Sequence, residues 1–272
     1  MDEKTAKIKK QALVHRLKEF DSLLVAFSGG VDSAFLLAMA HHTLKEKVVA
    51  ATATSNIHAM RENESARAFA LERNIKQIIF QSEEMSLPDF VSNNADRCYY
   101  CKRHLFQALL NIAGEKGIRH VAHGANLDDM KDYRPGFRAA DEAGVTAPLI
   151  EAQLSKGEIR FLSKEMGLKT WDKPSTPCLA TRIPYGSPVT KEKLRMIEKA
   201  EDLLLKLGVE EARVRHHGSV ARIEISLSKI NSVMEKESRN FVIEKFRKIG
   251  FKHVALDLEG YISGKMNRIL EK

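Results

Sequence analysis

The sequence predicts an α/β protein with an open parallel sheet that carries helices on both faces, followed by a smaller α+β domain. Over the first two-thirds of the chain, short apolar runs alternate with helical segments. This pattern is typical of parallel strands joined by helical crossovers. A proline-rich stretch then interrupts the alternation, and a shorter unit with its own helices and strands follows. We therefore expect two domains, residues 1–180 and residues 181–272.

The first domain begins with an amphipathic helix over residues 5–20 and a strand over residues 23–27, with the sequence LLVAF. Continuous apolar runs of this length are typical of strands that are covered on both faces. Further helices are predicted from residue 32, over 58–73 and over 103–113, and further strands over 47–54, 76–80 and 118–122. In sheets of this kind, ligands bind at the carboxyl ends of the strands.

The proline-rich stretch covers residues 173–188 (KPSTPCLATRIPYGSP) and holds four of the seven prolines. Because proline fixes φ and removes a hydrogen-bond donor, this stretch is predicted to be a linker or a functional loop. Beyond it, helices are predicted over residues 190–207 and 228–249, and strands over residues 220–227 and near 253–258.

Length and composition exclude several classes of protein. The 272 residues are 43% hydrophobic and 29% charged, which excludes a disordered chain, a collagen-like fibre and a disulfide scaffold. No apolar run reaches the roughly 18–20 residues of a membrane span, and the N-terminus lacks a signal-peptide core. We therefore expect a cytoplasmic protein with reduced thiols and no membrane partner. The net charge of +8 fits phosphates, nucleic acid or neither.

A phosphate-binding motif, SGGVDS, directly follows the first predicted strand and leads into a helix. Glycine lets backbone N–H groups approach an anion closely, and a helix N-terminus presents unpaired donors. The two serines add hydroxyl donors, and the aspartate can cap the helix or hold Mg²⁺. The motif is not a Walker loop, because no Gly-Lys-Ser/Thr follows it. The predicted phosphate cradle consists of Ser28, Gly29, Gly30, Asp32 and Ser33.

A second polar stretch follows the fourth predicted strand. Residues 123–129 read HGANLDD, and residues 132–136 read DYRPG. Side chains after a strand end line the ligand crevice of such a sheet. Here the aspartates can serve a metal, and Arg134 can bind a phosphate, although a solvated acidic loop is the alternative. From this stretch we assign Gly124, Asp128 and Arg134 to nucleotide binding.

SGGVDS resembles the PP-loop of the N-type ATP pyrophosphatases. Taken with GANLDD, DYRPG and PCLATRIPYG (residues 177–186), the chain resembles the LarE family of ATP-dependent sulfur transferases, which act in the synthesis of the nickel-pincer nucleotide of lactate racemase. The resemblance implies that ATP, with Mg²⁺, adenylates a carboxylate of pyridinium-3,5-biscarboxylic acid mononucleotide and releases pyrophosphate. Sulfur then displaces AMP and leaves a thiocarboxylate. The resemblance also implies a homo-oligomer, a hexamer.

The chain has three cysteines, a C-x-x-C pair at Cys98 and Cys101 and a distant Cys178. In one branch of the family, the cysteine at the position of Cys178 gives its sulfur to the product and is consumed. Three thiolates instead suit a 4Fe–4S cluster with one open iron, which can be reloaded from a sulfide source. We therefore predict a cluster on all three cysteines. Sacrificial sulfur from Cys178, and a persulfide or zinc arrangement, are the alternatives.

Several charged residues are candidate ligands for the substrate. Arg182, four residues after the third cysteine, is assigned with Cys178 to the catalytic step, because it can stabilise charge on the adenylate. Arg213 and Arg215 alternate along an extended segment, RVRHH, so both guanidiniums face one side and suit a mononucleotide phosphate. A solvated basic face is the alternative. Glu198 and Glu201 lie on one helix face and could reach a metal, although such pairs are more often solvated.

A tRNA-thiolating PP-loop enzyme is the main rival hypothesis, because the positive charge and the C-x-x-C pair are compatible with it. Against it, aromatic residues make up only 7% of the chain, and the basic residues do not cluster with them. We also recognise no appended RNA-binding module and therefore expect no nucleic-acid partner. A nucleotide sensor with the same fold would leave the three cysteines unexplained.

Overall fold

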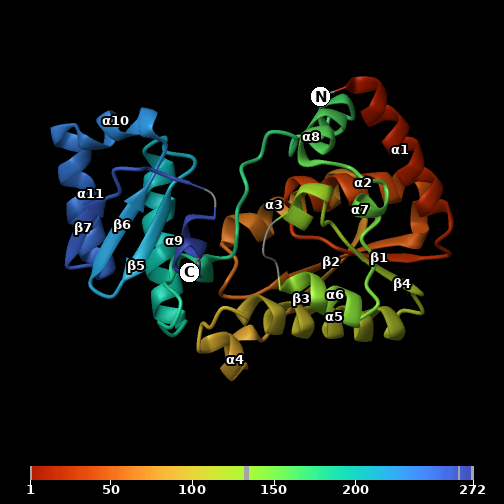
Figure 1. Cartoon of the computed structure of the whole chain (residues 1–272), viewed down its shortest axis with the longest axis horizontal. Helices are drawn as coiled ribbons and strands as arrows, with labels where there is room; N and C mark the ends of the chain where they lie inside the picture. The colour runs from red at the N-terminus through yellow and green to blue at the C-terminus, as the bar shows by residue number, and fades with distance from the viewer. Residues whose placement is uncertain (1, 132–134, 263, 271–272) are drawn as a thin grey trace. The chain divides into compact units, whose positions relative to one another are not determined.

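The computed structural model describes residues 2–131, 135–262 and 264–270, and Figure 1 shows its elements. The chain forms two compact units. The first unit comprises Met1–Glu84 and Cys98–Thr176, and the second comprises Met85–Arg97 and Pro177–Lys272. The short segment Met85–Arg97 therefore packs with the C-terminal part of the chain, although both of its neighbours in sequence belong to the first unit.

The sheet of the first unit has four parallel strands in the order β3-β2-β1-β4. Their bounds are β1 Leu23–Ala26, β2 Val48–Thr54, β3 Lys76–Gln81 and β4 His120–His123. Strands β2 and β3 extend the sheet on one side of β1, whereas β4 pairs on the other side. The strand order switches between β1 and β4, and sheets of this kind bind ligands at the carboxyl ends of the strands beside such a switch. This arrangement confirms the predicted fold class.

Helices cover both faces of this sheet (Figure 1). Leu23 and Val25 of β1 pack with α1, α2 and α8 on one face, whereas Leu24 packs with α5 and α6 on the other. This alternation is that of a strand buried on both faces. The bounds are α1 Glu3–Lys18, α2 Val31–Leu44, α3 Met60–Glu72, α5 Arg97–Glu115, α6 Gly136–Glu142, α7 Pro148–Glu151 and α8 Lys156–Glu165.

Two expectations about the elements need correction. The helix predicted over residues 103–113 begins at Arg97, so it includes both cysteines of the C-x-x-C pair. The helix predicted over residues 228–249 is two helices, because Glu235 has extended backbone angles. Helix α8 was not predicted, although Ser155 and Glu158 form a capping box at its start, a signal that is readable from sequence.

The second unit is the smaller α+β part that the sequence predicts. Its sheet has the order β5-β6-β7, with β5 and β6 antiparallel and β6 and β7 parallel. Leu204, Val214, Phe246 and Phe251 are among its core residues. The bounds are α4 Pro88–Val91, α9 Lys191–Lys206, β5 Arg213–His217, β6 Val220–Glu224, α10 Ile230–Met234, α11 Lys236–Ile249 and β7 His253–Leu256.

The segment Met85–Arg97 is held in the second unit by Asn93, a buried residue with a left-handed φ of 60°. Its side-chain amide donates to the carbonyl oxygens of Ile183 (3.3 Å), Pro184 (2.7 Å) and Ser187 (2.8 Å). One buried side chain thus donates hydrogen bonds to three carbonyl groups of a proline-containing loop. Without it, these carbonyl groups would lack hydrogen bonds, because burial removes them from water.

None of the helices in the described ranges is both long enough and apolar enough to cross a membrane.

Candidate functional site

The predicted phosphate cradle lies between β1 and α2, where the sequence analysis expects it. The hydroxyl oxygens of Ser28 and Ser33 are 3.1 Å apart, and the Ser28 N–H donates to the Ser33 hydroxyl at 3.3 Å. Gly29 has a φ of 74°, a conformation that glycine adopts without steric cost. The loop therefore folds back on the first turn of α2, where backbone N–H groups are available to an anion.

The carboxyl end of β4 meets this cradle at Gly124. A Cβ at this position would lie 2.8 Å from the backbone nitrogen of Ser33 and 2.9 Å from its Cα atom. Only glycine fits here without a shift of the backbone. The loop that follows β4, including Asp128, is therefore directed to the start of α2. Arg134, predicted from the same stretch as a phosphate ligand, lies outside the described residues.

A lysine lies between the predicted Mg²⁺ ligands. The Lys156 ammonium is 2.5 Å from Oδ2 of Asp32, and the Lys156 backbone N–H donates to Oδ2 of Asp128 at 2.9 Å. Burial raises the pKa of Asp32 above its usual range, although the charge of Lys156 acts in the opposite direction. Oδ1 of Asp32 is buried and finds no hydrogen-bond partner among the residues that the structure describes. A buried carboxylate oxygen of this kind suits a hard cation such as Mg²⁺.

Lys173 is a second basic residue at the cradle. Its ammonium donates to the carbonyl oxygen of Gly29 at 3.0 Å and to the Ser65 hydroxyl at 3.3 Å, and it pairs with Glu62 at 2.8 Å. Sequence reasoning missed both Lys156 and Lys173. Lys173 directly precedes the first proline of the loop, but the sequence carries no sign that this lysine contacts a glycine far away in the chain.

The predicted cluster ligands are divided between the two units. Cys98 and Cys101 lie three residues apart near the start of α5, and hence on one face of that helix. Cys178 precedes the 3₁₀ turn Leu179–Arg182 of the second unit. All three side chains are half-buried and form no disulfide. Across the described ranges, no group of three or more His, Cys, Asp or Glu side chains is arranged to hold a metal ion. The cluster stays a prediction.

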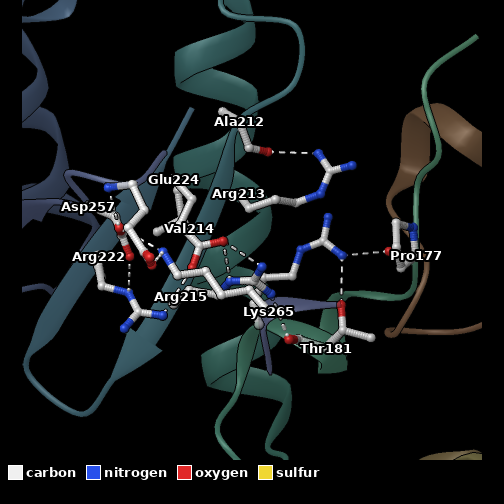
Figure 2. Close-up of polar contacts among 12 residues, drawn as sticks. Pro177, Thr181, Ala212, Arg213, Val214, Arg215, Arg222, Glu224, Asp257 and Lys265 are labelled. Carbon is white, nitrogen blue, oxygen red and sulfur yellow. Dashed lines mark hydrogen bonds and ion pairs between the residues drawn. The ribbon is translucent and has the colours of Figure 1, made fainter. Parts of the chain in front are cut away.

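The basic residues predicted in the second unit lie close together (Figure 2). Arg213 and Arg215 are both buried, so the alternative of a solvated basic strand face is wrong. Burial and the neighbouring charge of Arg182 lower the pKa of Arg213, whose guanidinium lies 4.9 Å from the centre of the Tyr261 ring. The guanidinium groups of Arg182 and Arg215 bind the carboxylates of Glu201 and Glu224.

Glu201 is buried, whereas Glu198 is half-buried. The two side chains therefore have different surroundings, although they lie one helical turn apart on α9. Glu201 binds Arg182 through both carboxylate oxygens, at 2.9 and 3.0 Å. The interpretation of Glu201 as a solvated surface residue is wrong.

The chain is similar to known proteins over most of its length. Residues 1–133 match the model of the PP-loop domain. The chain is 35% identical to the pyridinium-3,5-bisthiocarboxylic acid mononucleotide synthase of Lactiplantibacillus plantarum, and the alignment covers 98% of this chain and 97% of that protein. It is 42% identical to an uncharacterized protein of Synechocystis sp., over 93% and 95% of the two chains. An uncharacterized protein of Methanocaldococcus jannaschii is 30% identical, over 89% and 91%.

Proposed function

Because the chain belongs to the PP-loop family that includes pyridinium-3,5-bisthiocarboxylic acid mononucleotide synthase, we propose that it is an ATP-dependent sulfurtransferase acting on pyridinium-3,5-biscarboxylic acid mononucleotide. The observation that carries this proposal is the extent of the similarity. The alignment with the synthase spans 98% of this chain, so it includes the SGGVDS loop of the first unit and the Cys178 loop of the second.

In the proposed first step, a substrate carboxylate attacks the α-phosphorus of ATP, and pyrophosphate leaves. The cradle of Ser28, Gly29, Gly30 and Ser33 would bind the phosphates through N–H and hydroxyl donors. Asp32 and Asp128 would hold Mg²⁺, which neutralises the charge that develops on the departing oxygens. The unpartnered Oδ1 of Asp32 supports this assignment. Lys156 then acts as the counter-charge of Asp32 in the absence of the metal.

In the proposed second step, a sulfur nucleophile attacks the carbonyl carbon of the acyl adenylate, AMP leaves with the bonding electron pair, and a thiocarboxylate remains. We assign the handling of sulfur to Cys178. Three roles remain predictions from the sequence: the direct stabilisation of the adenylate by Arg182, the binding of a phosphate of ATP by Arg134, and the binding of the substrate phosphate by Arg213 and Arg215.

We further propose that Cys98, Cys101 and Cys178 hold a 4Fe–4S cluster that a sulfide source reloads. Thiolates are the ligands that iron–sulfur clusters use, and the spacing of Cys98 and Cys101 on one helix face suits two neighbouring irons. When bound through three thiolates, such a cluster would supply one iron with an open coordination position for sulfur. In the alternative, Cys178 itself supplies the sulfur atom.

The deciding experiment is iron and acid-labile sulfide analysis of protein purified without oxygen, combined with mass spectrometry of the product. We expect about four irons per chain and ATP-dependent formation of a thiocarboxylate. Cys98→Ala, Cys101→Ala and Cys178→Ala should each lose the iron. Iron-free protein in which Cys178 becomes dehydroalanine during turnover would overturn the cluster and leave the sulfurtransferase. Absence of any thiocarboxylate would overturn the sulfurtransferase activity, whatever the iron content.

We further propose that six copies of the chain form a homo-oligomer. We also propose that the protein is cytoplasmic. Light scattering on the purified protein tests the first of these, because a hexamer has six times the mass of the chain.

A further inference from the structure

Two arginines hold the backbone around Cys178. Nη1 of Arg182 donates to the carbonyl oxygens of Pro177 at 2.6 Å and Cys178 at 3.1 Å. The Cys178 carbonyl also accepts the N–H of Thr181 at 3.0 Å and its hydroxyl at 2.8 Å. One carbonyl thus receives three donors, and the turn that starts at Cys178 is closed by all of them.

The second arginine approaches the same turn at its other end. Nη1 of Arg215 donates to the carbonyl oxygen of Thr181 at 2.9 Å, and Figure 2 shows this side chain beside Thr181 and Glu224. Its Nε and Nη2 atoms both donate to Oε2 of Glu224, at 2.9 and 2.5 Å. Arg215 therefore connects β6 to the Cys178 turn.

Each guanidinium is in turn held by a buried carboxylate. Arg182 is 0% exposed and Glu201 is 2% exposed. Oε1 of Glu201 also accepts the backbone N–H of Val214 at 3.0 Å, which ties this pair to β5. Glu224 is 0% exposed and also accepts from Arg222 at 3.0 Å. Paired guanidinium and carboxylate groups in such surroundings are directional and oppose displacement.

We propose that Glu201 and Glu224 are positioning residues for sulfur transfer. They orient Arg182 and Arg215, whose guanidinium groups fix the backbone from Pro177 to Thr181 and hold the Cys178 thiol in one place within the second unit. This role rests on the proposed function only in that Cys178 handles the sulfur. It differs from the direct contact with the adenylate that the sequence analysis predicts for Arg182.

Glu201→Gln tests the proposal, because glutamine keeps the size of the side chain but replaces one carboxylate oxygen by a donor that opposes the guanidinium. Hydrogen exchange reports on the turn through two amides: Thr181 donates to the Cys178 carbonyl, and Ile183 donates to that of Ala180. We expect both amides to exchange at least tenfold faster in the variant. Glu201→Asp, which retains the charge, should restore part of the protection.

The reactivity of Cys178 gives a second readout. Cys98→Ser with Cys101→Ser leaves Cys178 as the last of the three thiols, and its rate of alkylation by iodoacetamide can be followed against pH. We expect Glu201→Gln to change this rate at least threefold. In the otherwise native protein, the same substitution should lower kcat at least tenfold and leave the KM for ATP within twofold, because the phosphate cradle lies in the first unit.

Val242→Ala is the matched control, since it removes two methyl groups from the core of the second unit away from the turn. Equal exchange of Thr181 and Ile183 in Glu201→Gln and in this control overturns the proposal. If Glu201→Gln does not fold, Arg215→Lys replaces it, because lysine cannot span Glu224 and the Thr181 carbonyl together. Failure of the enzyme to transfer sulfur would contradict the proposed function but would not alter the exchange and alkylation results.

Discussion

At the scale of single residues, His123 couples stability to pH. Its ring is half-buried beside Phe106 and Phe137, at centroid distances of 5.5 and 6.3 Å. Burial, helped by the charge of Lys102, lowers the pKa of His123 to about 4. Since the unfolded chain has the ordinary value of about 6.5, protons bind preferentially to the unfolded state. The contribution of His123 to stability is therefore complete above pH 6.5 and is lost as the pH falls to 4.

His123→Leu should weaken this dependence. Between pH 7 and pH 5, we expect the wild-type free energy of unfolding to fall by about 2 kcal/mol more than that of the variant. Urea denaturation of both proteins at several pH values measures this difference. Carboxylates titrate equally in the two proteins, so their contribution cancels. Parallel curves for the two proteins would contradict a depressed pKa.

Lys173 shows how one residue links the phosphate cradle to the loop that precedes Cys178. Its ammonium contacts both the Gly29 carbonyl and Glu62. Lys173→Gln removes a positive charge beside the proposed phosphate site. We expect ATP to bind about 10–100-fold more weakly, which corresponds to the loss of about 1–3 kcal/mol.

Calorimetric titration with ATP measures this loss, and Lys169→Gln provides the control. Lys169 also pairs with a glutamate of α3, Glu72, but its side chain is 81% exposed. Its affinity for ATP should match that of the wild type. Equal affinities in Lys173→Gln and Lys169→Gln would show that Lys173 has no part in nucleotide binding.

At the scale of elements, the junction of β4 with α2 determines the shape of the cradle. Gly124→Ala would place a Cβ 2.8 Å from the Ser33 nitrogen, and because the neighbour is backbone, the start of α2 must move. Overpacking of this kind costs about 1–3 kcal/mol. We expect a corresponding loss in urea denaturation, together with at least tenfold weaker binding of ATP, estimated as about 1.4 kcal/mol.

Gly114→Ala separates this clash from the general effect of replacing glycine. Gly114 lies in α5, and a Cβ there would have open space around it. The substitution should therefore raise the free energy of unfolding by up to about 1 kcal/mol, because alanine is the better helix former. A similar gain in Gly124→Ala would contradict the close approach of the two elements.

At the scale of the whole molecule, several of the cations behind the net charge of +8 are paired with carboxylates in the second unit. Arg182 and Arg215 are buried with carboxylates, and Arg222 and Lys265 share Asp257. Arg182 and Arg215 therefore make internal pairs, and phosphate backbones of RNA cannot use these two arginines as surface contacts.

We accordingly expect tRNA to bind weakly and without preference for one tRNA over another. Filter binding should give a dissociation constant in the micromolar range or weaker that rises steeply between about 50 and 200 mM salt, as non-specific binding does. Tight binding that persists at the higher salt concentration, with ATP-dependent incorporation of sulfur into the tRNA, would instead support the rival tRNA-thiolating activity.

The sequence by itself determined the properties that depend on neighbouring residues. The alternation of apolar runs predicted the parallel sheet, the SGGVDS motif located the cradle, and the period of two in RVRHH placed Arg213 and Arg215 on one strand. Helix ends were less accurate. The helix that carries Cys98 and Cys101 begins before the position that its apolar pattern indicates, because the pattern marks the buried face and not the first turn.

Only the tertiary structure decided which charges meet. Asp32 and Lys156 are 124 residues apart, Lys173 and the Gly29 carbonyl 144, and Arg182 and Glu201 19. No local pattern encodes such pairs, because each depends on how the helices and loops pack around a sheet. The three cysteines raised the question of the sulfur source from the sequence alone. The arginine and glutamate pairs around Cys178 became visible only in the folded chain, since a buried charge finds its partner through packing and not through proximity in sequence.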